Sequence, residues 1–159
     1  AIASRSHHTA PMSATLRDAA IGAFLGSLAV VGAFGLLVLF GLVPEAPWVT
    51  MWLHLFGGTG WVLPAVAGGL AFLVLGTLWG LPFAFVNEPS TFKGIVYGIV
   101  PTIWAWSGVP LILGTAPMGG LKPLGLAIPI VMNCLIWGSI LGWWCHRQIF
   151  GGNSGAVYY

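Results

Sequence analysis

The chain has 159 residues, of which 58% are hydrophobic and only 5% are charged, and its formal net charge is +2. A soluble globular domain carries about a quarter charged residues, so this composition excludes a water-compatible surface over most of the chain. The five basic residues are scattered singly, which excludes the basic stripe of a nucleic-acid-binding protein. We therefore expect an integral membrane protein whose partners are lipids and other membrane subunits, with no nucleic acid among them.

The N-terminal segment, residues 1–19, is predicted to be a cytoplasmic tail. Its first part, from Ala1 to Met12, is polar and lacks the apolar stretch that a secretory signal needs. An N-terminal Ala is compatible with removal of a start Met, although a cleaved signal peptide would also leave such an end. The adjacent His7 and His8 are expected to be solvated.

Four apolar segments follow, at about residues 20–43, 61–86, 95–114 and 124–145. Each is near the roughly 20 residues that a helix needs to cross the hydrocarbon core, and an unclosed strand would leave its backbone unpaired in lipid. The sequence therefore predicts an all-α bundle of four transmembrane helices within residues 20–147. The aromatic segment from Trp48 to Thr59 is interpreted as interfacial, Ser90 or Thr91 as the cap of the third helix, and residues 148–159 as a Gly-rich C-terminal tail.

The positive charges predict the orientation of these spans. Arg5, Arg17, Lys93 and Arg147 fall on one side of the membrane and only Lys122 on the other. Because basic residues favour the cytoplasmic side, both termini are expected in the cytoplasm of a multi-pass protein of the bacterial inner (plasma) membrane. Aromatic side chains near the span ends are then expected to form two interfacial belts, the outer from Trp48, Trp52 and Trp61 and the inner from Tyr97, Trp143 and Trp144.

Pairs of glycines four residues apart occur in every predicted span. Such pairs let helix backbones approach each other in lipid, so we expect helix packing at Gly22, Gly26, Gly76, Gly80, Gly94, Gly98, Gly138 and Gly142. All eight lie in the predicted cytoplasmic half, whereas the helix-bending Pro64, Pro110 and Pro129 lie in the outer half.

This distribution predicts a bundle that is tight toward the cytoplasm and splayed outside, built as a parallel pseudo-repeat of two hairpins. Alternatively, glycine is simply frequent in transmembrane helices. If the packing is specific, Leu at Gly94 or Gly138 should cost more stability than Leu at Gly41 or Gly114.

Few residues could carry chemistry. The carboxylates Asp18, Glu45 and Glu88 lie at span ends or in loops, so no intramembrane charge suggests a proton relay. No nucleophile sits beside a base and no phosphate-binding loop is present, so a non-catalytic protein is expected.

Candidate ligands and deep polar groups are equally sparse. His54 is the candidate for a single axial ligand of haem or of a chlorophyll-type pigment, although an interfacial histidine more often bonds backbone or lipid headgroups. His146 is expected at the opposite membrane surface.

Cys134 and Cys145 should lie about 16 Å apart on one helix, too far for a disulfide. Asn133, the most polar group deep in a span, is expected to bond a neighbouring helix, and deep indoles such as that of Trp137 should each need a partner for the N–H.

Three short motifs resemble a family of small four-helix bacterial membrane proteins of unknown function. They are Trp52-Leu53-His54, Trp79-Gly80-Leu81-Pro82 at the end of the second span, and Lys93-Gly94 with Tyr97-Gly98 in the third. The resemblance covers residues 15–147 and implies four spans, without implying an activity.

These observations favour a non-catalytic accessory or structural subunit of a larger membrane assembly, such as a respiratory or photosynthetic electron-transfer complex. Two alternatives stay open at this point. One is a small homo-oligomeric channel or carrier for a neutral solute, and the other is a pigment- or haem-binding protein that uses His54.

Overall fold

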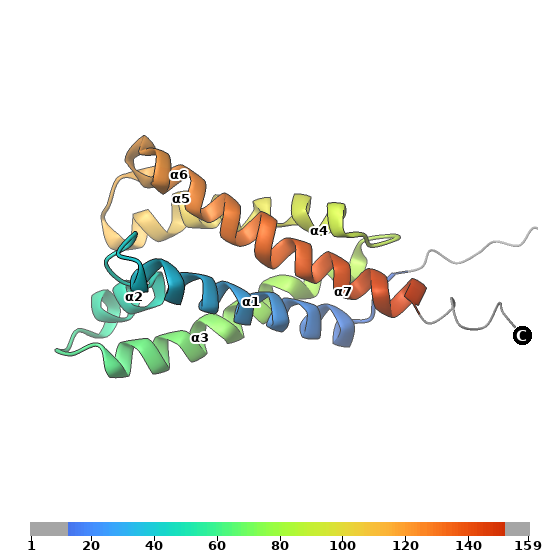
Figure 1. The fold of residues 1–159 in the computed structure, drawn as a ribbon, viewed down its shortest axis with the longest axis horizontal. Helices are drawn as coiled ribbons and strands as arrows, with labels where there is room; N and C mark the ends of the chain where they lie inside the picture. The colour runs from blue at the N-terminus through green and yellow to red at the C-terminus, as the bar shows by residue number, and fades with distance from the viewer. Residues whose placement is uncertain (1–12, 152–159) are drawn as a thin grey trace, which may run out of the picture.

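Four helical segments, each long and apolar enough to cross a membrane, run along the length of the molecule (Figure 1). The structure is a computed structural model and describes residues 13–151. The spans are Leu16–Leu39, Val62–Phe85, Thr91–Leu113 and Pro123–Phe150, and they pack as a bundle. The predicted all-α architecture of four membrane-spanning helices is therefore confirmed. Residues 1–12 of the predicted N-terminal tail, which include Arg5, His7 and His8, lie outside the described residues. The same holds for most of the predicted C-terminal tail.

The first span is the single helix α1 (Leu16–Leu39), which starts and ends before the predicted residues 20 and 43. Its start is set by Thr15, whose side-chain oxygen accepts a hydrogen bond from the Asp18 backbone N–H at 3.1 Å. This is a standard N-terminal cap, and the Asp18 carboxylate lies favourably at the positive end of the helix dipole. Beyond Phe40 the chain turns at Gly41, whose φ of 72° is readily adopted only by glycine.

The segment after α1 forms a separate short helix, α2 (Pro47–Phe56). It begins with Pro47, whose fixed φ suits the first helical position, and ends at Gly57 with φ 68°. The Trp48 ring packs between Phe34 of α1 and Phe72 of the second span, with ring centroids 5.8 and 5.0 Å away. The short helix is thereby anchored to the end of the bundle.

The second and third spans each change helix type along their length. The second consists of α3 (Val62–Gly80) followed by the 3₁₀ helix η1 (Leu81–Phe85). The third consists of α4 (Thr91–Tyr97) and α5 (Ile99–Leu113), which are divided at Gly98. Ser90 caps α4, because its hydroxyl oxygen accepts a hydrogen bond from the Lys93 backbone N–H at 3.1 Å.

The fourth span contains a change of helical register that the sequence did not predict. It runs from α6 (Pro123–Ile130) through the π-helix η3 (Val131–Gly138) into α7 (Ser139–Phe150). Pro129 precedes the π-helix and has no backbone N–H to continue the α-helical pattern. Helix α7 continues past the predicted span end at 145 and domain end at 147, since no helix-breaking residue occurs before Gly151.

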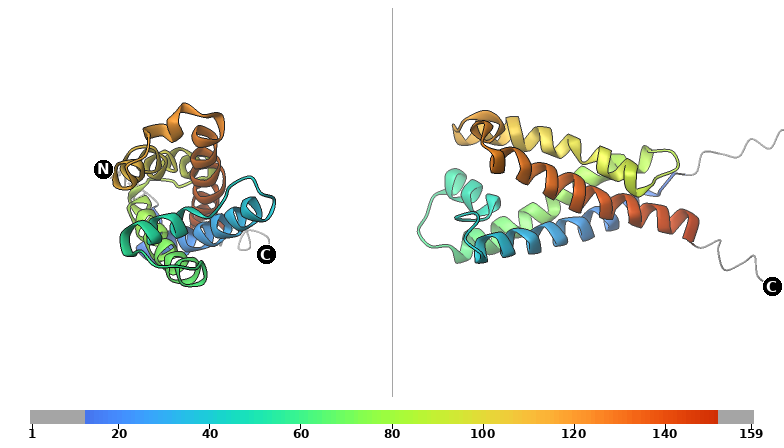
Figure 2. Two further views of the ribbon diagram at one scale, coloured as in Figure 1. Left: turned by 90° about the vertical axis from the view of Figure 1, so that its left-hand side faces the viewer. Right: turned by 45° about the horizontal axis from the view of Figure 1, so that its top comes forward.

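The spans form two antiparallel hairpins, the first from α1 and α3 and the second from α4, α5, α6, η3 and α7. Helix α1 contacts both α3 and α7, and α7 contacts α4, so α1 and α7 join the hairpins. The described ends of the chain lie at one end of the molecule, where the helices are close together (Figure 1). Toward the other end, which carries α2 and the 3₁₀ turn η2 (Pro117–Leu121), the hairpins diverge, as Figure 2 also shows.

Candidate functional site

Helix–helix contacts built on glycine are the main feature of the tight end of the bundle. In the second hairpin, a Cβ added at Gly94 would overlap the Gly138 carbonyl oxygen and would lie 2.7 Å from Cα of Gly142. One turn on, a Cβ at Gly98 would overlap the Asn133 carbonyl oxygen. These are backbone-to-backbone contacts, which cannot be relieved by rotating a side chain.

The first hairpin has contacts of the same kind, but they involve side chains. A Cβ added at Gly76 would overlap the Ser27 hydroxyl, and one added at Gly80 would overlap Cβ of Ala23. These contacts hold α3 against α1 at the same end of the molecule where α4 meets α7.

The two hairpins meet at two glycines of α1, Gly22 and Gly26. A Cβ at Gly22 would lie 3.3 Å from the Leu141 carbonyl oxygen, and one at Gly26 would lie 2.9 Å from the Trp137 carbonyl oxygen. The structure thus places each of the eight predicted packing glycines at a contact between helices of this one chain.

Thr102 makes the buried polar contact for which Asn133 was the sequence candidate. The Asn133 side chain is half-buried and makes no hydrogen bond to a described residue. Thr102 is 1% exposed, and its hydroxyl donates to the Gly98 carbonyl at 2.8 Å and lies 3.3 Å from the Pro129 carbonyl oxygen. Its Oγ1 is also 3.7 Å from Sγ of Cys134. A threonine in a helix usually bonds its own preceding turn, so the sequence offered no sign of the contact across to the fourth span.

Tyr97 lies inside the bundle instead of in an interfacial belt. Its hydroxyl donates to the Trp79 carbonyl at 2.5 Å, and its ring lies 5.4 Å from Phe83 and 5.9 Å from Trp137. Trp48 and Trp144 also pack against neighbouring helices, Trp144 with its Cβ against Gly22. Tyr97 thus departs from the belt prediction, because its ring faces other helices of the chain. Trp61 and Trp143 are exposed near span ends. The depth of Trp48 and Trp144 in the membrane stays a prediction.

Three tryptophans bury their indole nitrogen without a hydrogen-bond partner among residues 13–151. They are Trp106, Trp137 and Trp144. The expectation that deep indoles find an N–H partner is wrong for Trp137, whose side chain is only 3% exposed. Its ring stacks with Tyr97, so packing contributes where hydrogen bonding does not.

The two described histidines lie at opposite ends of the molecule, as expected. His54 is exposed on α2, and His146 on α7 has its Nδ1 3.1 Å from the Pro89 carbonyl oxygen. A shallow depression near the end of α2 is lined by Thr59, Gly60, Trp61, Val62, Leu63 and Val66, and His54 is not part of it. His54 thus lies on the exposed side of α2, outside this depression.

Cys134 and Cys145 are both buried free thiols. Within residues 13–151, no three His, Cys, Asp or Glu side chains come together in a group that could hold a metal ion.

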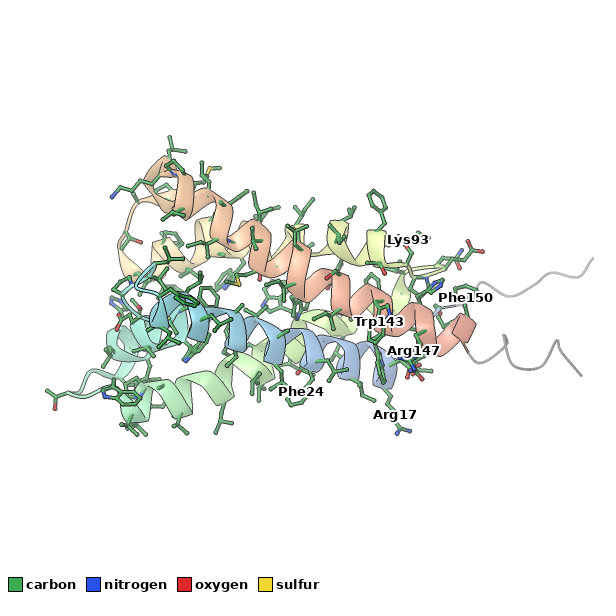
Figure 3. The ribbon with its side chains drawn as sticks, viewed as in Figure 1. Arg17, Phe24, Lys93, Trp143, Arg147 and Phe150 are labelled. Atoms are coloured by element: carbon green, nitrogen blue, oxygen red, sulfur yellow. The ribbon has the colours of Figure 1, made fainter. Side chains whose placement is uncertain are left out.

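The charged residues are segregated along the bundle axis. Arg17, Lys93 and Arg147 lie at the end that carries the described chain ends (Figure 3). Lys122 lies between η2 and α6 at the opposite end (Figure 1). The side of the membrane to which each end belongs stays a prediction from the charge rule.

Comparison of the chain with protein families, with curated proteins and with solved structures finds no match. The features on which the chain can be classified are thus its own four apolar spans and the contacts between them, and these make it a small multi-pass membrane protein with a four-helix fold.

Proposed function

We propose that the protein is a non-catalytic accessory or structural subunit of a larger membrane assembly, such as a respiratory or photosynthetic electron-transfer complex. It would reside in the bacterial inner membrane with both termini in the cytoplasm. The grouping of Arg17, Lys93 and Arg147 at one end of the bundle supports this orientation.

The observation that carries the proposal is a packing surface on α1 that no helix within residues 13–151 covers. Gly32 and Gly35 lie three residues apart, hence on the same side of the helix, and nothing lies within 4 Å of a Cβ added at either. Gly22 and Gly26 of the same helix, by contrast, are both covered by the fourth span. The neighbouring Leu36 is 55% exposed. In lipid, small residues of this kind favour close approach of another helix, so the surface suits a helix of a partner subunit.

Purification from the native membrane in mild detergent tests the proposal. The wild-type chain should be recovered with larger membrane subunits. Leu at Gly32 or Gly35 should lower the amount of co-purified partner about tenfold, as a loss of about 1.4 kcal/mol of binding free energy would. The melting temperature of the isolated chain should not fall, because no intramolecular contact is lost and Leu favours the helix over Gly.

A matched control is Ala71→Leu, which enlarges an exposed small residue of α3 outside this surface. It should leave partner recovery unchanged. Recovery of the wild-type chain only as a monomer or homo-oligomer would contradict the proposal. A homo-oligomer would instead favour the channel or carrier alternative, which solute flux into liposomes would then examine.

A further inference from the structure

A shallow apolar groove lies at the tight end of the bundle, between the start of α4 and the fourth span. It is lined by Thr91, Ser139, Ile140 and Trp143. The Ser139 hydroxyl is occupied within its own helix, where it donates to the Leu135 and Ile136 carbonyls. The groove therefore presents mainly methyl groups, methylene groups and an indole face, a surface that suits a hydrocarbon chain better than a polar solute.

A guanidinium group lies next to Trp143, one of the residues that line this groove. Arg147 follows Trp143 by one helical turn, and its Cζ is 5.5 Å from the centre of the Trp143 ring (Figure 3). Arg147 is exposed and forms no ion pair with a described carboxylate, and Trp143 is 45% exposed. Stacking on the indole orients the guanidinium while leaving its N–H donors available to an anion.

We propose that this groove and Arg147 together bind one anionic phospholipid. Arg147 holds the phosphate at headgroup level, and an acyl chain lies in the groove beside Trp143 and Ile140. The arrangement follows the physics of the interface, because tryptophan prefers the headgroup boundary and arginine beyond it attracts anionic lipid. A soluble phosphate would gain nothing from the apolar groove, whereas an amphiphile uses both parts of the site.

The neighbouring polar groups are compatible with this occupant. His146, next to Arg147 in sequence, has its Nδ1 3.1 Å from the Pro89 carbonyl oxygen. Asp18 and Glu88, the acidic residues at this end, form no ion pair with Arg147. The Arg147 charge beside Trp143 is therefore available to a lipid phosphate.

The test uses the full chain purified in detergent, with lipid binding measured by native mass spectrometry. Phosphatidylglycerol should bind more tightly than phosphatidylcholine with the same acyl chains. Arg147→Gln should weaken phosphatidylglycerol binding about fivefold, the factor expected for one basic residue near an anionic headgroup. Trp143→Leu should weaken binding of both lipids, because it removes part of the groove wall.

Arg17→Gln is the matched control, since Arg17 is an exposed basic residue at the same end that neither lines the groove nor lies over the Trp143 ring. It should leave phosphatidylglycerol binding unchanged. Equal binding of the two lipids would overturn the proposal, and so would equal losses in Arg147→Gln and Arg17→Gln, which would indicate diffuse attraction to the surface. Full competition by soluble glycerol phosphate would indicate an anion site without an acyl chain and would also overturn it. The measurement needs no partner subunit, so its outcome is independent of the function proposed above.

Discussion

Single residues decide how closely the helices can approach. The contact between Gly80 and Ala23 is the simplest case, because Cβ of Ala23 is the nearest atom to a Cβ added at Gly80, while the next atoms are 3.4 Å away at ordinary van der Waals distance. One methyl group fits between α1 and α3 at this level, and two do not.

This geometry predicts a compensating pair of substitutions. Gly80→Ala should destabilise the chain by about 1–3 kcal/mol, as overpacking of a tight core does. Ala23→Gly in the same chain should recover most of that loss, since it removes the atom that the new methyl group meets. Thermal unfolding of the two single variants and the double variant in detergent measures the coupling. Additive destabilisation would show that α1 and α3 are not in contact through these residues.

The buried indole of Trp137 shows how a large ring can be accommodated although its N–H makes no hydrogen bond. An N–H buried without a partner costs about 1–3 kcal/mol, and the N–H of Trp137 has none. The Trp137 ring nevertheless fills the junction between α1 and the second hairpin, where it stacks on Tyr97. The Trp137 backbone lies against Gly26. At this position the packing of a large ring outweighs the unmade hydrogen bond.

At the scale of elements, the pair α4 and α7 differs from α1 and α3 because backbone meets backbone. The atoms nearest to a Cβ on Gly94 belong to the main chain of Gly138 and Gly142. Relief would require the two helices to move apart, which would also disturb the neighbouring contact between Gly98 and Asn133. No compensating substitution is available at this contact.

Gly94→Ala is therefore expected to destabilise the isolated chain by about 3 kcal/mol, the upper end of the overpacking range. Gly35→Ala is the control. It lies within α1 with open space around it, and should be neutral or stabilising by up to roughly 1 kcal/mol through helix propensity. Thermal unfolding in detergent compares the two variants. Equal effects would mean that the glycine of α4 reflects composition and not packing.

The outer glycines, at which the sequence predicted a smaller loss of stability on substitution by Leu, are unsuitable as controls for Gly94→Ala. Gly41 and Gly114 have φ values of 72° and 68°. Any side chain at these positions would be strained whatever the surrounding space, so Leu there would report backbone strain as well as packing. That Leu costs less stability there than at Gly94 or Gly138 stays a prediction. These two glycines end α1 and α5. Apolar patterning alone does not distinguish this role from helix packing.

At the scale of the whole molecule, the segregation of charge predicts how the bundle sits in the membrane. Lys122→Cys should react with a membrane-impermeant maleimide added to intact bacterial cells in which the outer membrane is made permeable. Gln148→Cys, at the other end, should react only after the inner membrane is opened. The native Cys134 and Cys145 are buried, so they should give little background. Labelling of position 148 but not 122 in intact cells would reverse the orientation.

The sequence by itself determined the number and approximate place of the spans, a cap of the third span at Ser90 or Thr91, and the segregation of charge. These properties follow from the cost of placing polar groups in hydrocarbon and from local hydrogen bonding, and neither depends on which helices are neighbours. The glycine spacing likewise identified the residues that now lie at contacts, because a pair four residues apart lies on one helix face in any bundle.

Only the tertiary structure decided which apolar surfaces face protein and which face lipid. Trp48, Tyr97 and Trp144 pack inside the bundle, Gly32 and Gly35 remain open, and the fourth span shifts into a π-helix after Pro129. Hydropathy cannot separate these cases, since an apolar side chain has nearly the same free energy against a lipid tail as against a neighbouring helix. The choice is made by shape and by a few buried hydrogen bonds, such as that of Tyr97 to Trp79, which exist only once the helices have come together.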